Sequence, residues 1–395
     1  MVGRVLFIDK TPLFPNLFQN VQRAELHGIT SMTINEFNNT IKEKLQIDRD
    51  SKMPYQEYLR NFFKFYRDMV SNNVNADFVS KYLPSTTNID TIKKEILNTT
   101  NALLRAYNAY SEGKISTAIT IMKNRFLDTE RSEMSMRSLE LDHSLYWYRA
   151  RKLTKSNRHF QPKEMFHIPF EKRTEVVNYR YSISGYPCLY LGKTILSCWE
   201  EMGTPALDDL AISRLQVANG SKIKVFDLRI PSEITLTSLS EGPMEARGKK
   251  QNLDLLLTWP LIISCTIKSI TPDASFKHEY VHSQLLMLAL IENSNYYGVA
   301  YTSTHMDKNM SSNEDDYCNV AIPVKKVKAK GICSTLSSIF KLTRGVPLME
   351  MDIKNVFNES PIVTDGCLSI PDPTSHTKFE QAERWMDRIS LESIN

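Results

Sequence analysis

The feature that most constrains the fold of this chain is a change in hydrophobic periodicity near residue 140. Before that point, apolar residues recur at the spacing of one face of an α-helix. Beyond it, they form short runs that are rich in β-branched and aromatic residues and are separated by turn residues. The pattern predicts an α+β protein. We divide it into an all-α domain at residues 1–140, a mixed domain at 141–345 and a C-terminal extension at 346–395 that ends in a helix.

The first domain carries clear helix signals. Thr33-Ile-Asn-Glu36 is a capping-box pattern, in which two side chains satisfy backbone N–H groups at a helix start. Pro54 suits the first turn of a second helix, and a third apolar stripe that begins at Ile92 stops near Gly113. The aromatic residues of the second helix are expected to be core rather than a binding face. We find no catalytic constellation here, so the expected role is packing, oligomerisation or sensing.

The second domain is expected to contain strands and short helices without the regular alternation of a doubly wound parallel sheet. The final segment, from Ser375, predicts an amphipathic helix through Phe379, Trp385 and Ile389. The predicted strands are Tyr146–Arg151, Cys188–Leu191, Ile223–Ile230, Gly298–Tyr301 and Val320–Val324, and the predicted helices are Ile195–Met202, Leu253–Leu257 and Tyr280–Glu292.

Composition and charge argue against a membrane-spanning, a secreted or a nucleic-acid-binding protein. The densest apolar stretch, Leu253 to Cys265, is too short and too interrupted to span a bilayer, and the start of the chain lacks the pattern of a secretory signal. We therefore expect a soluble, cytoplasmic protein without a membrane partner. The 49 basic and 45 acidic residues give a net charge of +4 without a basic stripe, so nucleic acid is not an expected partner. The six scattered cysteines are interpreted as reduced core thiols.

The segment His278-Glu279-Tyr280-Val281-His282 matches the H-E-x-x-H pattern, in which two histidines bind zinc and the glutamate acts as general base. No Gly-x-x-His follows it, and a third ligand would have to be supplied by a residue such as Glu292. The favoured interpretation is a helix start with partly exposed histidines. A zinc peptidase through His278 and His282 is kept as an alternative.

The segment from Gly242 to Lys250 looks superficially like a phosphate-binding P-loop. Five residues rather than four separate Gly242 from Gly248, and Lys250 stands where a serine or threonine would meet magnesium. The chain also lacks the G-x-G-x-x-G motif of a dinucleotide cofactor site. We interpret the segment as a solvated loop and predict neither a bound metal nor a bound cofactor.

A third set of residues is dispersed along the second domain. Arg149 lies in an early predicted strand, and Glu201 lies eleven residues after the strand residue Tyr190. Ser303 follows the strand Gly298-Val-Ala-Tyr301. The order and approximate spacing are those of the RES domain, which is named for an arginine, a glutamate and a serine, and residues 146 to 325 resemble this family. Further pieces of the resemblance are Tyr179-Arg180-Tyr181-Ser182, Tyr280 and Gln284.

The resemblance implies a fold similar to that of ADP-ribosyltransferases, with a split β-sheet around a cleft for NAD+. It also implies an enzyme that breaks the nicotinamide–ribose bond of NAD+ by hydrolysis or phosphorolysis. NAD+ would be the substrate rather than a cofactor, phosphate would be a possible acceptor, and no metal is needed. The transition state resembles an oxocarbenium ion, which a nearby carboxylate stabilises. In this family such an enzyme is a bacterial toxin or an anti-phage defence effector.

The resemblance assigns a role to each site residue. Glu201, or its neighbour Glu200, would bind the ribose and stabilise the developing cation. Arg149 would bind pyrophosphate or an incoming phosphate as a planar bidentate donor, and Ser303 would orient Glu201 or the substrate. The expected substrate-binding residues are Tyr190, Arg180, Tyr181, Tyr301, Tyr280 and Gln284.

Three alternatives stand beside NAD+ degradation. ADP-ribose transfer to a protein or nucleic acid would use the same site, a zinc peptidase would use His278 and His282, and a non-catalytic binding module would keep the fold without turnover. The activity of a toxic enzyme has to be inhibited in the cell that produces it. The helical domain is therefore expected to bind a regulatory or antitoxin protein, or a second copy of the chain.

Overall fold

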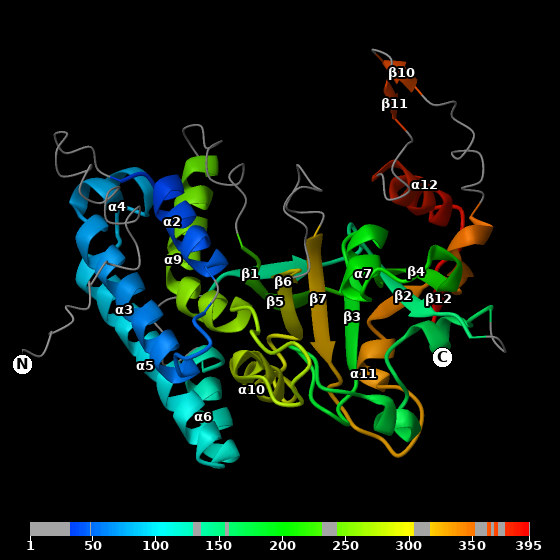
Figure 1. Ribbon diagram of the computed structural model, residues 1–395, viewed down its shortest axis with the longest axis horizontal. Coiled ribbons are helices and arrows are strands. Elements are labelled where there is room, and N and C mark those ends of the chain that lie inside the picture. The colour runs from blue at the N-terminus through cyan, green and yellow to red at the C-terminus, as the bar shows by residue number, and fades with distance from the viewer. Residues whose placement is uncertain are drawn as a thin grey trace, which may run out of the picture.

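A computed structural model describes residues 32–47, 49–128, 136–154, 158–230, 243–303, 317–351, 362–364, 367–369 and 376–394 of the chain. A layer of helices lies beside a curled mixed sheet, and further short helices flank the sheet (Figure 1). The predicted α+β class and the helical N-terminal region are confirmed. The likeness to ADP-ribosyltransferases stays a prediction.

The N-terminal helices begin and end close to the predicted positions. The Thr33 side chain accepts a hydrogen bond from the backbone of Glu36 at 3.2 Å, and the Glu36 carboxylate accepts one from the backbone of Thr33 at 2.8 Å, so the capping box is formed. Tyr55, Phe62, Phe63 and Tyr66 are buried, which confirms the aromatic helix as core. The helices are α2 (Ile34–Gln46), α3 (Tyr55–Asn73), α4 (Ala76–Tyr82), α5 (Ile89–Ser111) and α6 (Ile115–Phe126).

Two helices of the second half, α9 (Pro243–Thr266) and α10 (Val281–Leu290), pack against this helical layer (Figure 1). The Tyr66 hydroxyl donates to the backbone carbonyl of Leu256 at 2.5 Å, and the Trp259 indole donates to the Asn38 side chain at 2.8 Å. A single hydrophobic core joins α2, α3, α5 and α6 to α9, α10 and one face of the sheet. The helical region is therefore bound to the second half by buried surface.

The solvated loop predicted for residues 242–250 is wrong where the structure describes it, because α9 begins at Pro243. Its charged first turns are held by ion pairs one helical turn apart, Glu245 with Lys249 at 2.7 Å and Lys250 with Asp254 at 2.5 Å. Polar residues at the exposed start of a long helix resemble a loop in composition. Gly242 itself lies outside the described residues.

The sheet has the strand order β1-β5-β6-β7-β3-β2-β4-β8-β12, with β9 paired to β4. Among the described strands, β5 and β6 run parallel and the other neighbouring pairs run antiparallel. All five predicted strands are confirmed, whereas the prediction omitted β1, β4, β8, β9 and β12 of this sheet and the hairpin strands β10 and β11. The strands are β1 (Ser138–Leu141), β2 (Tyr146–Lys152), β3 (Cys188–Gly192), β4 (Leu210–Val217), β5 (Ile223–Leu228), β6 (Gly298–Thr302), β7 (Cys318–Pro323), β8 (Phe340–Leu342), β9 (Val346–Pro347) and β12 (Glu392–Ser393), and a separate hairpin holds β10 (Ile362–Thr364) and β11 (Cys367–Ser369).

Both faces of the sheet are covered. On one face lie α9, α10, α7 (Ile195–Glu201) and α12 (His376–Met386), whose apolar residues pack on β2, β4 and the central strands. The opposite face packs on the segment 160–170 and on α11 (Ser334–Ser337). Five described cysteines are buried free thiols, as predicted. None of the helices in the described ranges is long and apolar enough to cross a membrane.

Candidate functional site

Polar side chains gather on one face of the sheet at its centre. Tyr301 of β6 lies opposite Asn319 of β7, which in turn lies opposite Gly192 of β3. Since side chains alternate along a strand, Tyr190 shares the face of Gly192, and Ser303 shares the face of Tyr301. Three strands thus bring these residues to the face that carries α7.

Helix α7 places a carboxylate over this face. The Thr194 side chain caps the helix by accepting from the backbone of Ser197 at 3.1 Å, and Glu201 is the last helical residue. The helix crosses so close to β3 that a Cβ atom on Gly192 would lie 2.5 Å from the Ser197 hydroxyl, so glycine is required there. The Asn319 side-chain amide donates to the Glu201 carboxylate at 2.9 Å. Asn319 is only 2% exposed, while Glu201 is exposed and therefore accessible to a ligand.

Three tyrosines adjoin this carboxylate. The rings of Tyr181 and Tyr301 pack with their centroids 4.5 Å apart. Burial is the main reason that the pKa of each phenol, including Tyr190, lies well above its usual value, and the negative charge of Glu201 raises it further. The tyrosines are therefore neutral at physiological pH. They can offer ring faces and O–H donors, but no phenolate.

Arg149 approaches the same strands from the side. Strands β2 and β3 pair only at Tyr148 and Gly192, and the Arg149 guanidinium donates to the backbone carbonyl of Tyr190 at 3.0 Å. Burial, with a smaller effect of the neighbouring Arg151, lowers the pKa of Arg149 to about 10, so it stays protonated at neutral pH. Within the described part of the chain it has no carboxylate partner, and its Nε atom is buried without a hydrogen bond. A partly buried cation in this state favours an anionic ligand.

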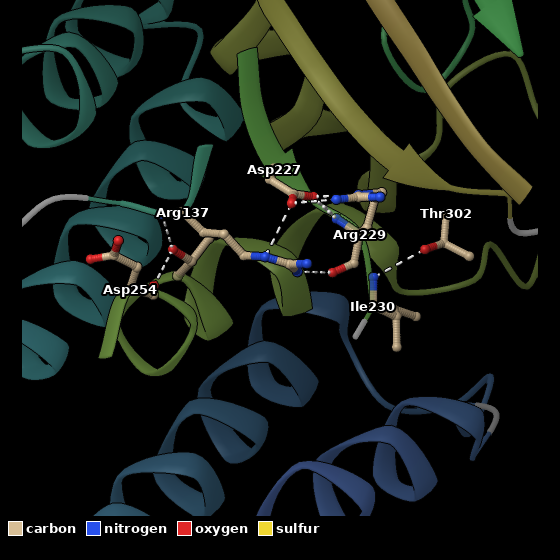
Figure 2. A network of polar contacts seen from close by, with 7 residues as sticks. Arg137, Asp227, Arg229, Ile230, Asp254 and Thr302 are labelled. Carbon is tan, nitrogen blue, oxygen red and sulfur yellow. Dashed lines mark hydrogen bonds and ion pairs between the residues drawn. The ribbon is translucent and has the colours of Figure 1, made fainter. Parts of the chain in front are cut away.

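Ser303 is buried directly after β6, and its backbone N–H donates to the carbonyl of Tyr317 at 3.2 Å. Residues 304–316, which follow it, lie outside the described residues. The strand end that carries Ser303 is held by Thr302, whose hydroxyl accepts from the backbone of Ile230 at 3.0 Å. This contact belongs to a larger polar network (Figure 2).

The centre of that network is Asp227, a nearly fully buried carboxylate of β5. Arg229 donates to it at 2.8 and 2.9 Å, and Arg137 lies 3.1 Å from it (Figure 2). Burial alone would raise the pKa of Asp227, but the two guanidinium groups outweigh burial and hold it below its usual value. The backbone N–H of Arg137 also donates to Thr258 of α9 at 2.8 Å. The network therefore ties helix α9 to the strand ends beside Ser303.

Arg180 and Gln284 hold the turn at residues 179–182. Arg180 donates to the carbonyls of Cys265 and Ile267 at 2.8 and 3.1 Å, at the end of α9, and its guanidinium lies 4.7 Å from the Tyr280 ring. The Gln284 amide donates to the carbonyls of Tyr179 and Ser182 at 3.1 and 3.3 Å. These contacts fix Tyr181 within the tyrosine group. In this structure the guanidinium of Arg180 donates its hydrogen bonds to backbone carbonyls.

A hollow of about 450 Å³ opens beside this turn and is lined in part by Tyr280, Gln284 and Lys277. Arg149, Glu201 and Ser303 do not line it. Around the central strands, Glu201 contacts Asn319 and lies near the three tyrosines, Arg149 contacts the backbone of Tyr190, and Ser303 lies at the end of β6. Tyr280 and Gln284 contact the turn at residues 179–182, which in turn carries Tyr181 of the tyrosine group.

The H-E-x-x-H segment has no zinc-site geometry. His282 is fully buried rather than partly exposed, and its Nε2 atom lies 2.9 Å from the carbonyl of Leu103, which corrects the prediction for this residue. His278 is exposed and contacts the Tyr107 hydroxyl at 2.7 Å. Glu279 is buried and paired with Arg49 at 3.1 Å, so it is not available as a base. Among the described residues, no group of three candidate metal ligands occurs.

Sequence reasoning missed Asn319, Asp227 and the two arginines around Asp227. Each of these residues interrupts or flanks an apolar strand, which is a visible signal for Asp227 and Asn319. Asp227 pairs with the nearby Arg229, but its other partner, Arg137, and the partner of Asn319, Glu201, lie far away in the sequence. The contacts themselves therefore could not be derived from spacing.

The chain is similar to "Putative toxin YopC" of Bacillus subtilis (strain 168). The two are 29% identical over 344 residues, which cover 85% of this chain and 76% of that protein. The similarity therefore extends beyond residues 146–325 into the helical region. No family model matches the chain, and no solved structure matches it significantly.

Proposed function

We propose that this protein is a toxin that degrades NAD+ by breaking the nicotinamide–ribose bond, as the resemblance to the RES domain implies. The observation that carries the proposal is the group around Tyr190. The partly buried Arg149 guanidinium, which has no carboxylate partner among the described residues, donates to its backbone carbonyl, and the charge of the accessible Glu201 carboxylate raises the pKa of its phenol. NAD+ has a positive nicotinamide ring and a negative pyrophosphate, so it matches one site with both charges. The name of the Bacillus subtilis relative supports the toxin role.

The proposed reaction breaks the bond between ribose C1′ and the nicotinamide nitrogen. The electron pair of this bond goes to the nitrogen and neutralises the nicotinamide ring, while positive charge develops on the ribose. Glu201 stabilises that charge, and an oxygen of water or phosphate then binds C1′; a water oxygen also releases a proton. Arg149 holds a phosphate group, and the neutral tyrosines pack against the ribose or nicotinamide.

The divergence of β2 from β3 supports the proposed likeness to the split sheet of ADP-ribosyltransferases. The two strands pair at one position, Tyr148 with Gly192, and Arg149 lies just beyond it. Ser303 would orient Glu201 or the substrate from the end of β6. In this proposal Arg180 supports the turn that carries Tyr181 rather than binding an anion.

We test the proposal by incubating the purified full-length chain with NAD+, with and without phosphate, and identifying the products. Hydrolysis is expected to release nicotinamide and ADP-ribose, and phosphorolysis nicotinamide and a phosphorylated ADP-ribose. Transfer would instead leave label from ADP-ribose-labelled NAD+ on a macromolecule. Intact NAD+ in all samples that contain folded protein would overturn the proposal.

Restraint of the toxin is proposed to occur through the helical layer. Leu97 of α5 and Ile115 of α6 are apolar residues about half exposed on that layer, at 45% and 46%. An antitoxin protein or a second copy of the chain would cover such residues. Sedimentation of the purified chain separates these cases, because self-association gives a dimer without any added partner.

A further inference from the structure

Asn319 donates a hydrogen bond to the candidate carboxylate of Glu201, and the resemblance to the RES domain assigns no role to it. It lies in β7, every residue of which is buried. Asparagine is disfavoured in strands, and a buried amide is costly unless both of its ends are hydrogen-bonded.

The two ends of the Asn319 amide are in different states. Its nitrogen donates to the Glu201 carboxylate at 2.9 Å, while its oxygen is buried without a hydrogen-bond partner among the described residues. Glu201 is at the C-terminal end of a helix of seven residues and is exposed. A side chain in that position would otherwise sample several rotamers, so the amide selects one of them.

We propose that Asn319 is a positioning residue that holds the Glu201 carboxylate toward the ribose of the substrate. This inference rests on the proposed function. The amide fixes one carboxylate oxygen, which leaves the other free to face the developing charge. Tyr301 lies directly opposite Asn319 on β6, in the same row of the sheet.

The first test replaces Asn319 by alanine in the full-length chain and measures the kinetics of NAD+ consumption. Loss of orientation is expected to lower kcat by about a hundredfold while KM changes little, since Arg149 and the tyrosines still bind the substrate. The thermal unfolding midpoint is expected not to fall, because an amide with one unpartnered end is removed. A purely structural residue would show the opposite, a lower midpoint with kcat preserved in the folded fraction.

The second test uses Asn319→Asp, which keeps the size and replaces the donor by a carboxyl group. At neutral pH the two adjacent carboxylates repel each other, so activity is expected to be lost. As the pH falls to about 5.5, one shared proton restores a donor, and activity is expected to rise relative to wild type. Loss of fold alone would not be reversed by acid.

Asn38 provides the matched control. It is 1% exposed, it also makes one side-chain hydrogen bond, with Trp259, and it lies in the helical layer. Asn38→Asp also buries a carboxyl group, but it is expected to keep wild-type kcat and pH profile in the folded fraction.

The outcomes separate the two claims. If wild type consumes NAD+ and Asn319→Ala retains its kcat, the positioning role is wrong while the proposed function stands. If wild type does not consume NAD+, the proposed function fails and the inference fails with it.

Discussion

At the scale of single residues, Arg149 differs from buried arginines of the helical layer. Arg125 is paired with Glu95 at 2.7 Å, and Arg49 with Glu279 at 3.1 Å. Those pairs compensate the cost of burying a cation, whereas Arg149 has a single backbone carbonyl among the described residues. Its contribution to the stability of the fold is therefore small or unfavourable, and we propose that its role is to bind the ligand.

We predict that Arg149→Met abolishes NAD+ degradation without lowering the free energy of unfolding. The control is Arg125→Met, which leaves the Glu95 carboxylate buried without its partner and is expected to cost roughly 3 kcal/mol. Urea unfolding and NAD+ assays on both variants provide the measurement. Equal destabilisation by the two substitutions would show that Arg149 is a structural cation.

Two buried histidines, His167 and His282, are expected to make the free energy of unfolding depend on pH. Burial is the main cause that lowers the pKa of both His167 and His282 from 6.5 to about 4. Between those values the unfolded chain binds protons that the folded chain does not. Stability is therefore fully present above about pH 6.5 and is lost as the pH falls toward 4, by up to roughly 3 kcal/mol for each histidine.

The variant His282→Gln tests this dependence, because glutamine can donate to the same carbonyl but does not titrate. Its free energy of unfolding is expected to fall less steeply with acid than that of wild type. Parallel curves for the two proteins would contradict the prediction.

At the scale of elements, the network of Asp227 joins β5 and the residues after it to β1, β6 and α9 (Figure 2). We predict that Asp227→Asn destabilises the protein by roughly 3 to 5 kcal/mol, because the ion pairs of Arg137 and Arg229 with a buried carboxylate are lost. The exposed pair of Lys64 and Asp68 is the control, and Asp68→Asn is expected to cost less than about 1 kcal/mol. If chemical denaturation gives both variants the stability of wild type, the network does not hold these elements together.

The sequence allowed most elements to be predicted, and the errors have physical causes. Strands such as Cys188–Gly192 are continuous apolar runs bounded by turn residues, and α2 has a capping box. Strand β4 was missed because Ser213, Arg214 and Gln216 interrupt its apolar pattern. Arg214 is buried there through an ion pair with Asp387 of the C-terminal segment, which local sequence cannot reveal.

The candidate site could also be predicted only in part, because some of its residues are recognised by their order along the chain and others only by long-range contacts. Arg149, Glu201 and Ser303 were identified by their order along the chain, which a family resemblance supplies. Asn319 and Asp227 act through contacts with residues about a hundred positions away. Their recognition requires the strand order and register, which the hydrophobic pattern alone does not determine.

At the scale of the whole molecule, the helical layer and the sheet share one hydrophobic core. Helices α5 and α6 of the predicted N-terminal helical domain pack directly on α9 and α10 (Figure 1). Regulation through the helical layer would therefore act on helices that also pack on the face of the sheet that carries the candidate site.

We predict that deletion of residues 1–140 prevents cooperative folding, because it uncovers apolar residues such as Leu256, Trp259 and Leu285. Circular dichroism and thermal unfolding of the truncated chain, beside the full-length protein, are the measurements. A monomeric truncated chain with a sharp unfolding transition would show that the second half folds independently.

NAD+ consumption by Glu201→Gln, measured beside Glu200→Gln, tests directly whether Glu201 is the catalytic carboxylate. The two substitutions change neighbouring residues in the same way, but only the first removes the carboxylate that contacts Asn319 and raises the pKa of the tyrosines. We predict that Glu201→Gln lowers kcat by about a hundred- to a thousandfold, while Glu200→Gln keeps activity in the folded fraction. Full activity of Glu201→Gln, or equal loss in both variants, would contradict the assignment of this site.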